Sequence, residues 1–436
     1  MVTAAAEAAA PVAIADPGTL SSTSIDRSPV SDLRVTHLDS GLTVATERVP
    51  GTRSVAAGVW VGVGARDEPV ELSGASHFLE HLLFKGTAQR SALDISRTID
   101  RHGGDINAFT TKEYTAYYCR LPARHAPTAI DLLGDVVTSP SLRDADVETE
   151  RHVILEEIAM DDDSPDDVAH RVFGEQVFPD HPLGLDTAGT PDTVQSITAD
   201  DVRSFFEQRY TAGSMFASIA GPLEHDDMLS LVADAFVRVR PGDGRRARQA
   251  PGSTATDRAV PDDSEQVQLI VGGRTFDRYD PDREALDVVN HVLGGGLSSR
   301  LFEEIRERRG LVYSVYSSVG LYSDCGLWNV AAGAQPRHAD EVLSLIRAEL
   351  DRLVADGITD EELEIATGYL TGAYELGLED TGSRMARNAG QLCTRGEIGD
   401  IAEQVARWNA VDHTAVRRVI DRVFAVDPIV VTVGPS

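Results

Sequence analysis

The 436-residue sequence is poor in cysteine, in basic residues and in long apolar stretches. Its three cysteines (Cys119, Cys325 and Cys393) lie far apart with no CxxC spacing, which excludes a disulfide framework and favours a reducing compartment. Lys and Arg total 40 against 70 Asp and Glu, a net charge of −30 that would repel phosphate, so we expect no nucleic-acid partner. The early apolar stretch between Arg53 and Arg66 spans about 12 residues, whereas a bilayer helix needs ~20. The N-terminus also lacks the basic cluster that opens a signal peptide, so we expect a cytoplasmic protein with no membrane contact.

The apolar content is sufficient for more than one core. At 436 residues and 42% hydrophobic composition, the chain is expected to form at least two globular domains. Residues 1–31, rich in Ala, Pro, Ser and Thr, are typical of a flexible tail. The segment 241–263 combines Gly and Pro with a basic cluster and few large apolar residues, which is linker composition. We therefore predict domains at 32–240 and 264–436.

The two predicted domains resemble each other. A β-type run ends in Gly-Pro at Gly221 and again at Gly434, and an Arg-His-Ala sequence opens a helical stretch at Arg124 and again at Arg337; both pairs are 213 residues apart. Residues 54–63 and 115–121 read as strands in the first part, as do 267–272 and 313–319 in the second. The pattern predicts a duplicated α+β domain, each copy a mostly antiparallel sheet with helices packed against it.

One segment carries the strongest chemical signal. Between Ser73, which is suited to begin a helix, and Gly86, which is suited to end it, His77 and His81 stand at i and i+4 with Glu80 between them. On a helix both imidazoles project from one face at a spacing that suits a single metal ion. The arrangement is HxxEH, the reverse of the HExxH zinc motif. The alternative is a pair of surface histidines beside a salt-bridging glutamate.

A catalytic zinc site needs a third protein ligand. The helical run that begins at Glu148 supplies three candidates, Glu150, Glu156 and Glu157, and spacing does not choose among them. Glu150 and Glu157 share a helix face at i and i+7 beside an apolar stripe. A solvated acidic face is the alternative interpretation of this run.

Four motifs together resemble the pitrilysin-like zinc metallopeptidases, of the inverzincin type, and especially their processing-peptidase branch. They are the HxxEH helix, the run Glu150-Arg-His-Val-Ile-Leu-Glu-Glu157, a Gly103-Gly-Asp-Ile-Asn107 sequence, and a glycine-rich segment from Gly294 through Arg306. The resemblance implies half of a peptidase clamshell that binds one Zn²⁺ per chain. It implies His77, His81 and Glu157 as the metal ligands, Glu80 as the general base, and Glu150 as a second acidic residue that supports catalysis.

The resemblance also implies how peptide substrates bind. Asn107, Ala108 and Phe109 match an edge strand to which an extended peptide adds by backbone hydrogen bonds, although an ordinary strand is the simpler interpretation of the residues alone. Arg306 and Tyr313 match residues that hold substrate, and in a two-domain chain they are implied to complete the site of a second copy in a homodimer. An offset of 213 places no metal ligand in the second domain, so that domain is expected to be metal-free.

The sequence thus favours a zinc-dependent endopeptidase in which Glu80 activates water. The alternative function is a non-catalytic peptide-binding or scaffold subunit of a processing-peptidase-like complex, and a related partner chain in place of the second copy stays open.

Overall fold

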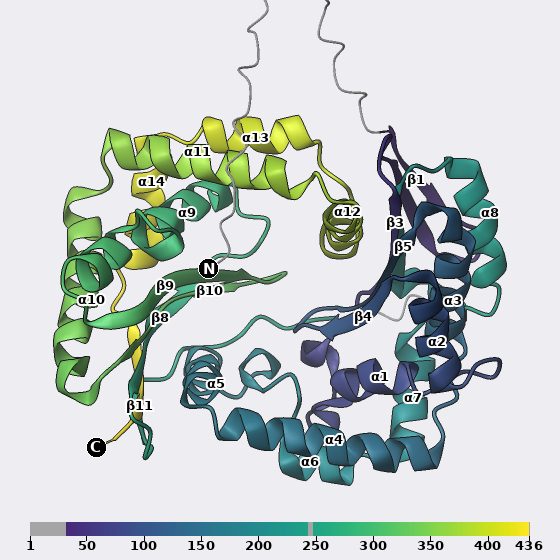
Figure 1. The fold of residues 1–436 in the computed structure, drawn as a ribbon. Coiled ribbons are helices and arrows are strands. Elements are labelled where there is room, and N and C mark those ends of the chain that lie inside the picture. Colours follow the sequence, from purple (N-terminus) through teal and green to yellow (C-terminus); the bar gives the residue numbers. More distant parts are fainter. Residues whose placement is uncertain (1–31, 243–246, 436) are drawn as a thin grey trace, which may run out of the picture.

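The computed structural model describes residues 32–242 and 247–435, so the predicted tail 1–31 lies outside the described residues. Two units of similar architecture face each other across the molecule (Figure 1). Each unit is a mainly antiparallel sheet with helices packed against it, which confirms the predicted α+β class. Within the described ranges, no helix combines the length and the apolar character that crossing a bilayer requires.

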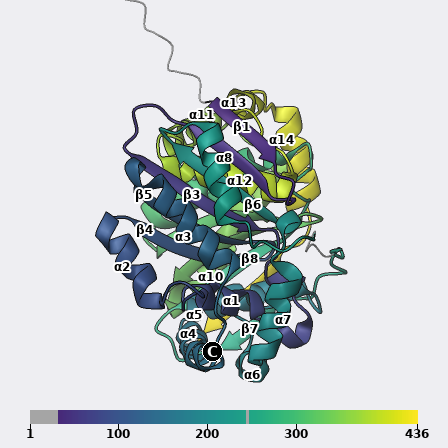
Figure 2. The same cartoon turned by 90° about the vertical axis from the view of Figure 1, so that its right-hand side faces the viewer.

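The sheet of the first unit has the order β1-β2-β6-β3-β5-β4, and only the β2–β6 pair is parallel. Its strands are β1 (Asp32–His37), β2 (Thr43–Arg48), β3 (Ser54–Val61), β4 (Asp105–Thr110), β5 (Thr115–Pro122) and β6 (Met215–Gly221). The helices are α1 (Ala75–Leu83), α2 (Ala92–His102), α3 (Ala126–Thr138), α4 (Asp144–Asp162), α5 (Pro165–Val177), α6 (Pro191–Ser196), α7 (Ala199–Arg209) and α8 (His225–Ala235). Figure 2 looks onto the outer face of this unit, where α3 and α8 cross in front of the strands. The order leaves β4 as an edge strand.

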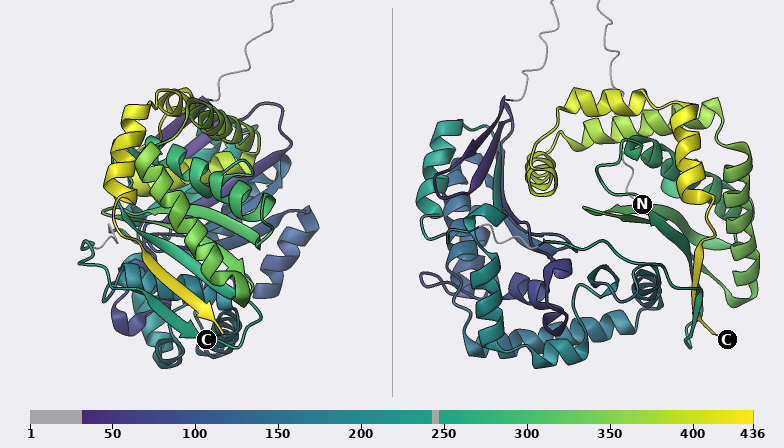
Figure 3. Two further views of the ribbon diagram at one scale, coloured as in Figure 1. Left: turned by 90° about the vertical axis from the view of Figure 1, so that its left-hand side faces the viewer. Right: turned by 180° about the vertical axis from the view of Figure 1, so that it is seen from behind.

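The sheet of the second unit has the order β7-β11-β8-β10-β9, which repeats the order of β2, β6, β3, β5 and β4. Its strands are β7 (Arg258–Pro261), β8 (Val267–Thr275), β9 (Val312–Leu321), β10 (Gly326–Ala334) and β11 (Ile429–Gly434). The helices are α9 (Arg283–Asn290), α10 (Ala339–Asp356), α11 (Asp360–Gly377), α12 (Thr381–Arg395), α13 (Ile401–Asn409) and α14 (His413–Val419), with π-helical turns at 291–295, 302–307 and 420–424. Figure 3 (left) shows this unit from its outer side. The repeated strand order confirms the prediction of two similar domains.

One helix of each unit packs on the sheet of the other unit. Helix α12 of the second unit packs on β3 and β6, where Met385 and Leu392 contact a cluster that includes Trp60. Helix α5 of the first unit packs on β8 and β11, where Phe173 joins Ile270 in a common core. Because each sheet therefore has a face covered by the other unit, the two units are joined by buried apolar surface.

One part of the predicted linker belongs to the second sheet. Strand β7, at 258–261, lies inside the segment 241–263 and pairs in parallel with β11. It is a short edge strand whose side chains are mostly exposed, and Val260 alone packs against the apolar cluster of α5, β8 and β11, so no apolar alternation marks the strand in the sequence.

Candidate metal centre

Helix α1, which carries the HxxEH motif, begins at a tightly fixed backbone position. Gly74 precedes the helix with a φ of +99°, and a Cβ there would lie 2.5 Å from the carbonyl oxygen of Ala188. The buried carboxylate of Glu68 accepts hydrogen bonds from the N–H groups of Gly74 (2.8 Å) and Ser76 (2.6 Å). The prediction that Ser73 caps this helix was wrong, because Glu68 binds the free N–H groups instead.

Three side chains, two from α1 and one from α4, converge between these two helices. His77 and His81 have ring centroids 4.7 Å apart, and Glu157 reaches both of them from α4. Its Oε2 lies 3.9 Å from Nε2 of His77 and 3.5 Å from Nε2 of His81. In the described part of the chain this is the one group of three or more His, Cys, Asp or Glu with donor atoms within 4.8 Å of one another.

The group fits a zinc ion. Two imidazole nitrogens and one carboxylate oxygen are a donor set typical of catalytic zinc, and ligand bonds of about 2.1 Å place tetrahedral donors about 3.4 Å apart. The separations of 3.5 and 3.9 Å are close to that value. Of the three candidate carboxylates, Glu157 reaches both rings and Glu156 is exposed on another face of α4.

Glu150 lies behind the group. Its side chain is 2% exposed, and its Oε2 lies 3.1 Å from Nδ1 of His81 while Oε1 pairs with Nζ of Lys85 at 2.6 Å. A carboxylate on Nδ1 holds the proton there and leaves Nε2 free to bind a metal. We therefore describe Glu150 as a residue that positions His81.

The protonation states also suit a hydrolytic site. Burial, and then the neighbouring His81, lowers the pKa of His77 to about 4, so the ring is neutral near pH 7. Burial raises the pKa of Glu80, opposed by a 2.6 Å hydrogen bond from the hydroxyl of Thr110 to its Oε2. A raised pKa brings a carboxylate closer to the range in which a general base works best at neutral pH.

Strand β4 runs along the edge of the sheet next to α1. Ala108 donates its N–H to the side-chain oxygen of Asn107 at 2.8 Å. Phe109 points to the face opposite Thr110 and meets Trp60 and Tyr118 with ring centroids 6.2 and 6.1 Å away. A cavity of about 370 Å³ opens there between the sheet and α12.

Arg306 and Tyr313 lie in the other unit, at the π-helical turn 302–307 and on β9. The guanidinium of Arg306 stacks 5.3 Å from the ring of Tyr313, which is 85% exposed. The structure does not bring them into the His77–His81–Glu157 group, which is formed entirely by α1 and α4.

Sequence reasoning missed three residues of the site: Glu68, Lys85 and Thr110. Thr110 comes directly after the proposed edge residues 107–109, and Lys85 comes four residues after His81. Their closeness in sequence to predicted site residues could have indicated them. Glu68 precedes the helix in a loop, where nothing local marks it as a cap.

Comparisons with known proteins show the family of this chain. Residues 43–191 fit the family model of Insulinase (Peptidase family M16), and residues 196–368 fit that of the Peptidase M16 inactive domain. An uncharacterized zinc protease of Streptomyces coelicolor is 42% identical over 418 residues, covering 93% of this chain and 90% of the relative. This chain belongs to peptidase family M16. The predicted pitrilysin-like resemblance is thereby confirmed.

Other M16 relatives are similar over most of their length. An uncharacterized zinc protease of Mycobacterium tuberculosis is 44% identical over 364 residues, covering 81% of this chain and 82% of the relative. A protease of Helicobacter pylori has the same fold, with a TM-score of 0.87 at 23% identity over 93% of this chain and all of that one. An M16-like peptidase structure from Alicyclobacillus acidocaldarius gives a TM-score of 0.83 at 22% identity, covering 93% of this chain and 99% of that chain.

Proposed function

We propose that this M16 protein is a zinc-dependent endopeptidase that hydrolyses peptides or unfolded polypeptide segments. The observation that carries the proposal is the convergence of His77, His81 and Glu157, with Glu80 on the same helix as both histidines. His77, His81 and Glu157 would hold one zinc ion. Zinc supplies Lewis acidity, which polarises a carbonyl oxygen and acidifies water.

The chain's own residues supply the proton transfers. Glu80 accepts a proton from the attacking water and afterwards passes it to the leaving amine. Thr110 holds one oxygen of Glu80 through the 2.6 Å hydrogen bond, which fixes the direction of the carboxylate. Glu150 keeps the proton of His81 on Nδ1, away from the ligand position.

Edge strand β4 would bind the substrate as an added strand. A peptide carbonyl replaces the side-chain oxygen of Asn107 as the acceptor for the N–H of Ala108. Side chains of such a peptide alternate between the α1 side and the cavity beside Phe109, which is open to an apolar group. The binding mode requires an extended chain, so unfolded segments are better substrates than folded proteins.

We also propose a homodimer with composite sites. Tyr313 is a large aromatic residue that is almost fully exposed, and Arg306 stacks on it, so the pair presents a prepared surface. In a two-fold dimer this surface of one copy can face the metal site of the other. Sedimentation should show a dimer, and mixing Glu80→Gln with Tyr313→Ala subunits should restore some activity, because one composite site then has both intact parts. A fully active monomer contradicts this arrangement.

A non-catalytic peptide-binding subunit is the second candidate function. The match of residues 196–368 to the inactive-domain model leaves this function open, since that range covers much of the second unit. Two measurements on the purified chain distinguish the two functions: its zinc content and its cleavage of peptides.

Digestion of a random peptide pool tests the proposal. Sequencing of new termini should show cleavage by the purified protein, loss of cleavage with a zinc chelator, and recovery when zinc is restored. Peptide binding without new termini in the zinc-loaded protein would support the scaffold function instead.

A further inference from the structure

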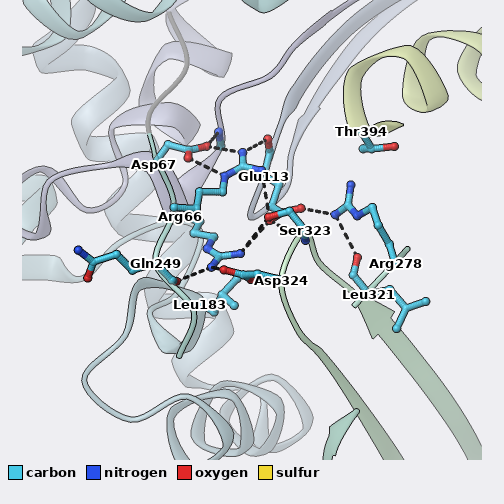
Figure 4. Close-up of polar contacts among 12 residues, drawn as sticks. Arg66, Asp67, Glu113, Leu183, Gln249, Arg278, Leu321, Ser323, Asp324 and Thr394 are labelled. Carbon is cyan, nitrogen blue, oxygen red and sulfur yellow. Dashed lines mark hydrogen bonds and ion pairs between the residues drawn. The ribbon is translucent and has the colours of Figure 1, made fainter. Parts of the chain in front are cut away.

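The carboxylate of Glu113, in the turn between β4 and β5, is a meeting point of the two units. Its side chain is 3% exposed. Arg66 donates to it at 2.9 Å, Arg248 pairs with it at 3.2 Å, and Arg278 of the second unit forms a further hydrogen-bonded ion pair. Ser323, also of the second unit, donates both its N–H (3.1 Å) and its hydroxyl (2.7 Å) (Figure 4).

The cluster is balanced in charge. Arg66 also binds Asp324 of the second unit at 2.6 Å, and Arg248 binds Asp67 through two hydrogen bonds of 2.9 and 2.8 Å. Three guanidinium groups thus meet three carboxylates in a largely buried place. Buried ion pairs add little net stability compared with apolar contacts, because desolvation cancels most of the attraction, but they fix geometry. We therefore expect the cluster to fix the position of the chain segments that it joins.

The turn that the cluster holds leads directly to the general base. The N–H groups of Ala65 and Arg66 bind the carbonyl oxygens of Thr111 (3.0 Å) and Lys112 (2.8 Å), so the turn is also held from behind. Thr110 comes immediately before this turn, and its hydroxyl binds Glu80. Contacts are continuous from the second unit through Glu113 and the turn to the carboxylate of Glu80.

We propose that Glu113 is a positioning residue through which the second unit sets the hydrolytic geometry of the first. Arg278 and Ser323 hold the Glu113 carboxylate. The position of this carboxylate sets the position of the turn, and the turn places Thr110 against Glu80. The inference rests on the proposed function, since it needs Glu80 to be the general base. It gives the second unit a part in the reaction of the same chain, exerted through the position of Thr110 and Glu80.

Arg278→Gln tests the inference, with Arg300→Gln as its matched control. The two arginines have similar exposure, 11% and 15%, and each pairs with a carboxylate, but Arg300 binds Glu362 within the second unit at 2.6 and 2.8 Å. We expect Arg278→Gln to lower kcat about tenfold or more, since a misplaced catalytic group costs up to about 10²-fold per ångström. KM should change less than about threefold, and one zinc per chain should remain. Arg300→Gln should leave kcat unchanged.

A double-mutant cycle separates positioning from general loss of stability. If Arg278 acts through Thr110, then Arg278→Gln should lower kcat less than about twofold when Thr110→Val is already present. Ser323→Ala removes only one hydroxyl and is the milder variant should Arg278→Gln fold poorly; it should lower kcat about threefold. Additive losses with Thr110→Val, or equal losses in Arg300→Gln, overturn the inference.

Hydrogen exchange gives a readout that does not depend on activity. In Arg278→Gln the amides of Thr111 to Tyr114 should exchange faster while those of α1 do not, and Arg300→Gln should leave this turn unchanged. If the turn exchanges faster in Arg278→Gln but the wild type cleaves no peptide, then the coupling holds and the proposed function is wrong. Normal cleavage and unchanged exchange in Arg278→Gln would refute the coupling itself.

Discussion

Replacement of Glu150 probes the metal centre without touching a proposed ligand. Its carboxylate, 2% exposed on α4, lies 3.1 Å from Nδ1 of His81 and 2.6 Å from the ammonium of Lys85. Glu150→Gln keeps the shape and one acceptor oxygen for His81 but removes the negative charge. Glu150→Ala removes the acceptor as well, so the ring of His81 loses its fixed tautomer and orientation.

The expected magnitude follows from the role of this contact. Loss of a hydrogen-bond partner behind a metal-binding histidine costs about 10- to 100-fold in metal affinity. This corresponds to about 1.4 to 2.8 kcal/mol of binding free energy. We expect Glu150→Gln near the lower limit and Glu150→Ala near the upper one. The second variant also leaves the ammonium of Lys85, which is 38% exposed, to be solvated by water.

Competition between the protein and a fluorescent zinc chelator measures this affinity. Two residues of the same helix calibrate the scale: Glu157→Gln should abolish stoichiometric binding, and Glu156→Gln, which changes an exposed carboxylate, should bind zinc as the wild type does. Wild-type affinity in both Glu150 variants, or a loss in Glu156→Gln as large as that in Glu157→Gln, would refute the assigned geometry.

Three further predictions concern catalysis, substrate binding and stability. Thr110→Val removes the 2.6 Å hydrogen bond to Glu80 and should lower kcat about tenfold with zinc content unchanged; an unchanged kcat would show that Glu80 is held by other groups. Ala108→Pro removes the donor that now binds Asn107 and should raise KM for peptides several-fold, measured with a fluorogenic peptide, whereas an unaffected KM argues against strand addition. Burial raises the pKa of Asp287 from 3.8 to about 6, so its carboxylate form disfavours folding once the pH exceeds about 4, and the cost is complete above about pH 6. Asp287→Asn should therefore raise the unfolding free energy at pH 8 by about 2 to 3 kcal/mol, seen as a higher Tm, and have little effect at pH 4. An equal effect at both pH values contradicts this.

The local part of the site could be predicted from the sequence. The i, i+4 spacing of His77 and His81 fixes their common face once the segment is helical, and the structure has that helix. The choice between Glu150, Glu156 and Glu157 could not be made in this way, because it depends on how α4 is rotated against α1. The family resemblance indicated Glu157, and tertiary packing places its carboxylate beside both rings.

The contacts between the units could not be predicted. Helix α12 has an apolar face, but nothing in its sequence indicates that the face packs on the sheet of the other unit. The cluster around Glu113 joins residues up to 258 positions apart, as in the pair of Arg66 and Asp324, and isolated charged residues in a sequence carry no sign of their partners. The duplication itself was predictable because the offset of 213 residues recurs in two separate motifs.

The most direct test of the zinc endopeptidase function combines zinc content with cleavage in Glu80→Gln. This substitution leaves the three metal donors in place and removes only the proposed base. We expect one zinc per chain in both proteins, cleavage of a peptide pool by the wild type, and no new termini from the variant. A wild-type chain without stoichiometric zinc, or a variant that still cleaves peptides, would contradict it.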